Sequence, residues 1–253
     1  MIKTRSGLNS WVRVPERSEG GNNNNNEGNG RDNDYHEFEG VSDYDGWEYE
    51  GDDVQQVLNF FRQNSNSYEL LDSLTNEERG AFQEWTRGAL MDSEQWYDWH
   101  SISRWTQNII RNIAKKLDTA RLDRGMVVTR LGSGELLPGI GRMASSLGEL
   151  QALKGQVIPV NGLMSWGAAK EGLLIPGGGR PKNIEFKLRI PAGTRGAGTW
   201  IGDSRVSPYW GARQREFITN RDIDVRVGDS RYDRRRDKYV VELEYVGRRR
   251  HPF

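Results

Sequence analysis

The chain of 253 residues has a formal net charge of zero, and only 35% of its residues are hydrophobic. It contains no cysteine, which excludes a disulfide framework, a zinc site with cysteine ligands and a thiol nucleophile. The mean hydropathy of −0.81 is low for a chain that folds throughout, but nine Trp and nine Tyr can fill a core. We therefore expect a packed domain over part of the length.

The zero net charge conceals a division between the two ends of the chain. Residues 1–100 carry 21 acidic and 8 basic side chains, whereas residues 101–253 carry 15 acidic and 28 basic ones. An acidic segment beside a basic working surface suits the binding of anions. The first residues lack the apolar core of a secretory signal, and no stretch is apolar enough to span a bilayer. These features predict a cytoplasmic protein, or one delivered into a target cell without that signal, and no membrane partner.

Residues 1–53 are predicted to form a disordered acidic segment. The stretch 20–30 is rich in Gly and Asn and cannot bury enough apolar area to offset the entropy of the chain. Residues 31–53 mix acidic and aromatic side chains, which is typical of a solvated linker. The aromatic side chains leave a second interpretation open, in which this segment covers the basic half and restrains activity, or docks an inhibitor protein.

Helices are predicted from about Val54 onward. Thr75 and Glu78 have the spacing of a capping box, so that a helix is expected to begin there. Another helix is expected from about Ser101, because apolar residues recur at spacings of three and four at Ile102, Trp105, Ile109, Ile113 and Leu117.

After Asp123 the apolar pattern changes from helical to alternating. A short apolar strand covers residues 126–130, and clean period-two runs cover residues 184–190, 222–227 and 239–246. Gly-rich turns between them favour an antiparallel or mixed sheet. The predicted architecture is therefore α+β, with a helical layer followed by a β-rich core.

Three segments of the β-rich half carry residues suited to chemistry. Arg130 ends a strand and is followed by Gly132, Ser165 lies in the sequence GLMSWG at 162–167, and Glu216 ends the triplet QRE at 214–216. In this order and at these separations they resemble the Arg–Ser–Glu class of mono-ADP-ribosyltransferases, the bacterial exoenzyme-like family. Residues 74–85, the sequence GRP at 179–181 and the turn at 190–197 are also similar to that family, so that the resemblance covers about residues 70–247.

The resemblance implies a catalytic domain over residues 54–247 and leaves a basic tail at residues 248–253. In that domain N-terminal helices would pack on a β-rich core of two small antiparallel or mixed sheets. It also implies an enzyme that takes NAD as its substrate, needs no metal and transfers ADP-ribose to a macromolecule. A toxin, a phage-encoded modifier and a defence effector are all compatible with such an activity.

The same resemblance implies a role for each site residue. Breaking the nicotinamide–ribose bond builds positive charge on the ribose, and Glu216 is expected to stabilise that charge where it develops. Arg130, Gly132 and Arg180 are expected to bind NAD, and the two arginines suit its pyrophosphate because a guanidinium is planar and always charged. Ser165 is expected to orient Glu216 by a hydrogen bond.

The second motif departs from the family pattern. The family has Ser-Thr-Ser where this chain has Ser165, Trp166 and Gly167, so that two hydroxyl groups are missing. The hydrogen bonds around Glu216 must therefore differ, and a reduced catalytic rate is compatible with the loss. Because Trp166 is large and flat, we predict that it stacks on the nicotinamide or forms a wall of the NAD pocket.

Gln214 bears on the acceptor of ADP-ribose. Members of the family that modify arginine have Glu at this position, whereas an amide can pair with another amide or with the edge of a nucleobase. The resemblance therefore implies an acceptor other than arginine, either an Asn or Gln side chain of a protein or a base in DNA or RNA. Tyr209 or Trp210, just upstream, is expected to grip that acceptor.

Other features leave alternatives open. Arg-rich runs at 231–236 and 248–250 suit phosphate contacts but are also typical of solvated loops. The three His residues are too dispersed for a ligand cluster, so that no metal is predicted. The same residues would serve an NAD glycohydrolase that uses water as acceptor, and a non-catalytic module that binds nucleic acid is the third interpretation.

Overall fold

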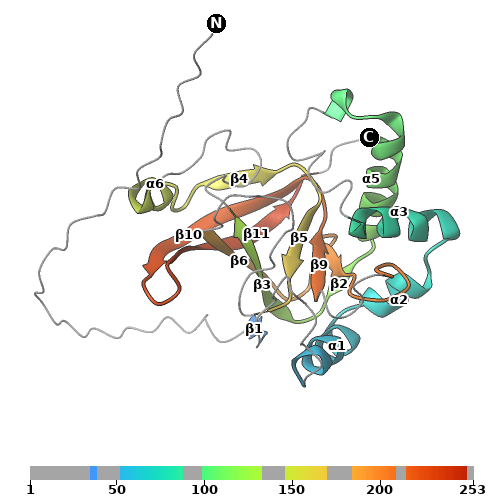
Figure 1. The fold of residues 1–253 in the computed structure, drawn as a ribbon, viewed down its shortest axis with the longest axis horizontal. Coiled ribbons are helices and arrows are strands. Elements are labelled where there is room, and N and C mark those ends of the chain that lie inside the picture. Colours follow the sequence, from blue (N-terminus) through green and yellow to red (C-terminus); the bar gives the residue numbers. More distant parts are fainter. Residues whose placement is uncertain are drawn as a thin grey trace, which may run out of the picture. The chain divides into compact units, whose positions relative to one another are not determined.

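The computed structural model describes residues 35–38, 52–87, 99–132, 146–169, 184–208 and 215–249 (Figure 1). The chain divides into two units, residues 1–32 and 33–253, and all the elements described below belong to the second. None of the helices in these ranges is long and apolar enough to cross a membrane.

The helices precede most of the strands, as the sequence predicts. Their bounds are Asp52–Asn64 (α1), Ser67–Asp72 (α2), Asn76–Thr86 (α3), Arg104–Leu117 (α5) and Leu147–Ala152 (α6), with a 3₁₀ turn η1 at Trp99–Ser101. The predicted capping box is confirmed, because Thr75 Oγ1 accepts from the Glu78 amide at 3.2 Å and Glu78 Oε2 accepts from the Thr75 amide at 2.8 Å.

The helix α5 begins two or three residues later than the apolar pattern predicts. Its N-cap is Ser103, whose side chain accepts a hydrogen bond from the amide of Thr106 at 3.1 Å. Ile109, Ile113 and Leu117 are buried against the core, as expected. Trp105 was wrongly placed in this buried stripe, since it lies in the first turn with 57% of its surface exposed.

The strands are short except for one long hairpin. Their bounds are Tyr35–Glu37 (β1), Arg121–Leu122 (β2), Gly125–Gly132 (β3), Val157–Val160 (β4), Met164–Gly167 (β5), Ile184–Ile190 (β6), Thr194–Arg195 (β7), Gly198–Trp200 (β8), Glu216–Thr219 (β9), Ile223–Asp233 (β10) and Lys238–Arg248 (β11). The strand at residues 126–130 and the three period-two strands predicted from sequence are β3, β6, β10 and β11.

The strands form two blocks that meet at a single pair of residues. The order β4-β10-β11-β6-β3-β5-β9-β8 is mixed, with β6 and β11 parallel and the other neighbours antiparallel. Between β3 and β5 only Thr129 and Gly167 are paired, and Thr129 Oγ1 also donates to the carbonyl of Ala169 at 2.9 Å. The predicted β-rich core with helices packed on it is therefore confirmed; its two blocks form one nine-stranded mixed sheet together with β1, and β2 and β7 form a separate two-stranded sheet.

The strand β1 corrects the prediction for residues 1–53. Tyr35–Glu37 pairs in parallel with Gly125–Val127 at the start of β3, on the side of β3 that β5 occupies further along. Phe38 follows with only 3% of its surface exposed and contacts Phe60 and Phe61 of α1 at ring-centroid distances of 5.1 and 5.8 Å. The prediction of disorder is thus wrong at residues 35–38, which belong to the packed domain.

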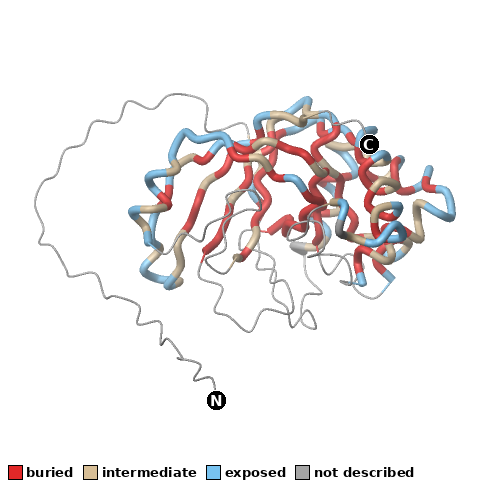
Figure 2. The backbone as a smooth tube through the Cα atoms, turned by 90° about the horizontal axis from the view of Figure 1, so that it is seen from above, coloured by how far each residue is buried: buried red, intermediate tan, exposed pale blue. Residues whose placement is uncertain are grey.

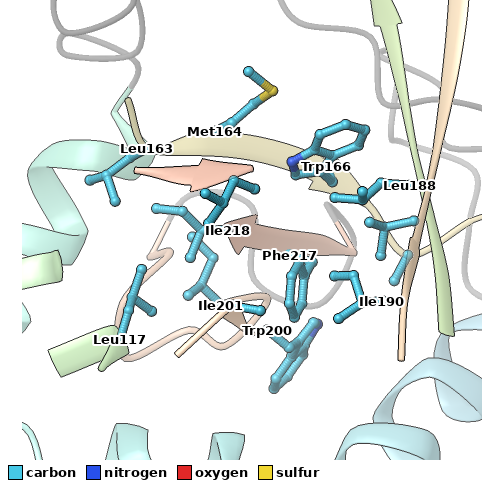
Figure 3. Packing of buried hydrophobic residues seen from close by; sticks show 14 of the residues in the cluster. Leu117, Leu163, Met164, Trp166, Leu188, Ile190, Trp200, Ile201, Phe217 and Ile218 are labelled. Carbon is cyan, nitrogen blue, oxygen red and sulfur yellow. The ribbon is translucent and has the colours of Figure 1, made fainter. Parts of the chain in front are cut away.

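The core lies between the helices and the two strand blocks. Figure 2 shows the buried stretches concentrated along the strands and on the inner sides of the helices. In the close view of Figure 3, Trp200 and Phe217 lie beside each other, with Ile201 and Ile218 next along the chain from each. Phe61 of α1 stacks on both rings, at 5.9 Å from Trp200 and 6.0 Å from Phe217. The helix α1 is thereby joined to β9, the strand that begins with Glu216.

Candidate active site

The central residue of the site is Glu216, the first residue of β9. It lies opposite Gly167 of β5, and its carbonyl accepts a hydrogen bond from the Ile201 amide at 2.9 Å. Only 1% of its surface is exposed, although a carboxylate is almost never buried without a partner. The backbone on both sides therefore holds Glu216 inside the protein.

The two oxygens of the Glu216 carboxylate have different surroundings. Oε1 accepts a short hydrogen bond from Ser165 Oγ of β5 and a second, at 3.4 Å, from Trp85 Nε1 of α3. Oε2 is equally buried but has no hydrogen-bond partner among the described residues. One oxygen is thus fixed by two donors, and the other accepts no hydrogen bond from the described residues.

Burial raises the pKa of Glu216, because the charged form loses its hydration. The hydrogen bonds from Ser165 and Trp85 and the charge of Arg130 act in the opposite direction, but burial outweighs them. A buried carboxylate with a raised pKa is a feature of catalytic acids and bases.

Arg130 joins this group from the other strand block. It lies near the end of β3, two residues before Gly132, and its Nη1 donates to the carbonyl oxygen of Ser165 at 2.7 Å. Its charge also acts on the Glu216 carboxylate. Three residues that the sequence singles out, Arg130, Ser165 and Glu216, are therefore brought together from three strands.

Trp166 does not lie where the sequence analysis placed it. Side chains alternate along β5, so that Trp166 and Ser165 point to opposite faces of the strand. Trp166 is fully buried, its Nε1 donates to Thr219 Oγ1 at 3.1 Å, and Figure 3 shows its ring in the hydrophobic cluster near Leu188. The prediction that Trp166 contacts NAD is corrected, because this side chain belongs to the core.

Trp85 is a site residue that the sequence analysis missed. Its place on the buried face of α3 is evident from the helical pattern, but the pattern does not show which strand that face meets. Neighbouring side chains of α3 fix the loop after β8, since Gln83 Nε2 donates to the carbonyl of Arg205 at 3.0 Å and Thr86 Oγ1 to that of Val206 at 2.9 Å. The helix α3 thus holds both Glu216 and the chain that leads toward residues 209–214.

Arg215, between Gln214 and Glu216, has an unusual backbone. Its φ of +46° lies in the left-handed region, which residues other than glycine rarely adopt. Its side chain is buried, and its carbonyl accepts from the Ala168 amide at 2.8 Å. The chain therefore turns sharply just before Glu216 enters β9, in a conformation of the kind that often accompanies functional sites.

Four predicted site residues lie outside the described residues. They are Arg180, assigned to the NAD phosphates, and the acceptor residues Tyr209, Trp210 and Gln214. Within the described ranges no group of His, Asp and Glu side chains is arranged to hold a metal ion.

Known structures share this architecture. No protein-family model matches the sequence, and no curated protein matches it. The structure is similar to Plx2a, an ADP-ribosyltransferase toxin from Paenibacillus larvae, with a TM-score of 0.60 and 17% identity over 77% of this chain and 97% of Plx2a. The fold is that of ADP-ribosyltransferase toxins.

Two further solved structures cover more of the chain. C3stau2 from S. aureus, solved with NAD, matches with a TM-score of 0.59 and 15% identity over 84% of this chain and 100% of its own. The C3 exoenzyme of Clostridium limosum matches with a TM-score of 0.58 and 12% identity over 84% of this chain and 97% of its own. At these identities the likeness establishes the fold, and the chemistry must be argued from the residues.

Proposed function

We propose that this protein is an NAD-dependent mono-ADP-ribosyltransferase in which Glu216 is the central catalytic residue. The observation that carries the proposal is the Glu216 carboxylate, buried with one oxygen held by Ser165 and Trp85 and the other without a partner. The fold of ADP-ribosyltransferase toxins supports it independently.

The geometry suits the chemistry of the nicotinamide–ribose bond. As that bond breaks, its electron pair leaves with nicotinamide and positive charge develops on the ribose. A carboxylate oxygen held in place beforehand stabilises this charge more in the transition state than in the ground state, which is what accelerates the reaction. Glu216 Oε2 is the atom for this role, and Ser165 and Trp85 are positioning groups. The acceptor then bonds to the ribose carbon and loses a proton.

The residues around Glu216 fit NAD as the substrate. Arg130 lies on the opposite strand block and places a permanent cation within electrostatic reach of Glu216. Arg130 and Arg180, with Gly132 two residues after Arg130, would hold the pyrophosphate, because guanidinium groups bind phosphate oxygens bidentately. The nicotinamide end would then face Glu216 across the junction between the two blocks.

Gln214, two residues before Glu216, underlies the proposed acceptor class. An amide side chain has a carbonyl and an NH₂ group but cannot take a proton from a guanidinium. We therefore infer an acceptor other than arginine, an Asn or Gln side chain or a nucleobase, gripped by Tyr209 or Trp210. As part of the same proposal, the protein acts in the cytoplasm of the cell that it modifies, as a toxin or as a phage or defence effector. An inhibitor protein that binds it also belongs to this proposal.

Labelled NAD tests the transfer and names the acceptor class. Incubation with NAD labelled in the adenosine moiety and whole-cell lysate should label a macromolecule, and protease or nuclease treatment should then release the label. Agmatine, which carries a free guanidinium, should stay unlabelled. Free ADP-ribose with no labelled macromolecule would instead identify an NAD glycohydrolase, and the absence of any NAD turnover would contradict both activities.

A further inference from the structure

The hairpin formed by β10 and β11 ends in a turn that is rich in arginine, and residues 231–238 are called the hairpin tip here. Asp233 closes the turn, because its Oδ1 accepts from the amides of Arg235 and Arg236 at 3.0 and 3.3 Å. The Arg236 side chain turns inward, where it donates to Asp233 Oδ2 at 2.7 Å and to Glu185 Oε2 at 2.8 Å. Glu185 is fully buried on β6, so that the tip is anchored to the sheet.

This anchoring leaves two neighbouring cations facing solvent. Arg234 and Arg235 are exposed, and no ion pair joins their guanidinium groups to any residue that the structure describes. The acidic side chains of the tip are already engaged, Asp233 by Arg236 and Asp237 by the hydroxyl group of Tyr232. The positive charge of Arg234 and Arg235 is therefore not neutralised within the described part of the tip.

An aromatic ring lies beside these cations. The Tyr232 ring packs against that of Tyr239 across the hairpin, with centroids 5.2 Å apart. Tyr232 still exposes 42% of its surface, which is rare for a large side chain in the described residues. The contact with Tyr239 and the hydrogen bond to Asp237 hold the ring in one orientation, so that its outer face forms a prepared stacking surface.

The hairpin tip lies at the same end of the sheet as Gly132, the last residue of β3. Tyr239 of β11 is level with Ile184 of β6, and Ile184 is level with Gly132 of β3. Two strand spacings therefore separate Tyr239 from Gly132, which is roughly 10 Å. A long ligand bound along the tip would thus extend toward the end of β3 that carries Arg130.

We propose that the hairpin tip binds single-stranded nucleic acid. Exposed arginines contact phosphates, and a fixed aromatic ring stacks on a base that is not held in a duplex, which is the common way of binding such strands without sequence preference. Charge attraction alone would let an acidic protein segment pair with Arg234 and Arg235, whereas a base also stacks on the Tyr232 ring. The proposal goes beyond ADP-ribose transfer, because this binding requires neither NAD nor Glu216.

Fluorescence anisotropy with a labelled oligo-dT strand and the full chain tests the proposal. The double variant Arg234→Ala/Arg235→Ala should bind at least about tenfold more weakly. Its plot of log K against log salt should flatten by about 1.4, the value for two lost phosphate contacts to a single strand. The control Arg104→Ala/Lys115→Ala removes two exposed cations from α5 and should bind like the wild type.

Variants of Tyr232 distinguish base stacking from simple charge attraction. Tyr232→Ala should weaken binding by about tenfold with an unchanged salt slope, whereas Tyr232→Phe should retain it. An equal loss of affinity for oligo-dT in the tip double variant and the α5 double variant would overturn the proposal. The proposal would also be overturned if Tyr232→Ala bound oligo-dT with unaltered affinity and poly-glutamate displaced the labelled strand as well as unlabelled oligo-dT does. That result assigns the tip to an acidic protein. Nicotinamide release, measured on the same samples, should be equal in all variants and reports separately on the proposed function.

Discussion

At the scale of single residues, Glu216 places a carboxylate where water cannot reach it. Burial raises the pKa of Glu216, so that the folded state binds its proton more tightly than the unfolded state does. Glu216 therefore contributes to the free energy of unfolding below the unfolded pKa near 4.5, and that contribution is lost as the pH rises through the higher folded pKa. Above the unfolded pKa, burial of Glu216 therefore opposes folding.

Glu216→Gln should consequently make the protein more stable at pH 7.5. Chemical denaturation should show a higher free energy of unfolding than for the wild type, and the difference should shrink as the pH falls toward 4. The matched variant Glu244→Gln changes an exposed carboxylate of β11 and should alter stability by no more than about 0.5 kcal/mol. A Glu216→Gln protein that is less stable than the wild type at pH 7.5 would refute the unfavourable burial of this charge.

Ser165 should reveal its positioning role in the pH profile of activity. Its hydrogen bond lowers the pKa of Glu216, so that Ser165→Ala should move the acid side of the kcat profile to higher pH as well as reduce kcat. A Ser165→Thr variant keeps a hydroxyl group and should restore the profile. Lower kcat with an unmoved profile would mean that Ser165 supports the strand without acting on the carboxylate.

The chemistry-bearing residues could be predicted in part from the sequence. Arg130, Ser165 and Glu216 are marked by their residue types and their order along the chain, and the structure brings them together. Trp85 could not be predicted, because its role depends on which strand the helix α3 meets. The prediction for Trp166 was wrong for a related reason. Side chains alternate along β5, and because Ser165 faces Glu216, Trp166 points to the opposite face of the strand.

At the scale of elements, β1 changes what is expected from a deletion of the N-terminal segment. It pairs with the start of β3, and Phe38 packs on Phe61 of α1, which in turn contacts Phe217, the neighbour of Glu216. Removal of residues 1–53 would therefore remove part of the core as well as an acidic segment. Any gain in activity from such a deletion has to be measured against this loss of stability.

Phe38→Ala should lower the free energy of unfolding by about 3–5 kcal/mol, the usual cost of truncating a buried Phe. The exposed Glu37 on the same short strand provides the control, and Glu37→Ala should change stability by at most about 0.5 kcal/mol. Both values come from denaturant titration of the full chain. Equal, small effects of the two variants would show that β1 adds little to the packed domain.

The strands show where sequence patterns succeed and where they stop. Runs of six or more alternating residues identify β6, β10 and β11, because one face of each is buried. The strand β1 has three residues in an acidic, Asn-rich context, and its local signal is limited to the aromatic residues Tyr35 and Phe38. Pairing with a distant strand creates β1, and no local pattern encodes that.

At the scale of the whole domain, the backbones of the two strand blocks pair, among the described residues, only at Thr129 and Gly167. The proposed substrate contacts both blocks, through Arg130 on one side and Glu216 on the other. A ligand that binds the folded state stabilises it by mass action, so that NAD at about 100 times its Kd should raise the free energy of unfolding by about 2.7 kcal/mol.

Thermal or chemical unfolding with and without NAD measures this effect. Arg130→Ala should abolish most of the stabilisation at the same NAD concentration, and Arg226→Ala, which removes an exposed arginine of β10, should leave it unchanged. Stabilisation of Arg130→Ala equal to that of the wild type would exclude Arg130 from NAD binding.

The release of nicotinamide from NAD by the purified chain tests the central claim most directly. Wild-type protein and Glu244→Gln should release nicotinamide at equal rates. Glu216→Gln should be slower by at least about 100-fold, the effect of losing a group that stabilises transition-state charge, while its Kd for NAD stays within a few-fold of the wild-type value. Wild-type rates of release from Glu216→Gln would contradict the assignment of Glu216 as the catalytic residue.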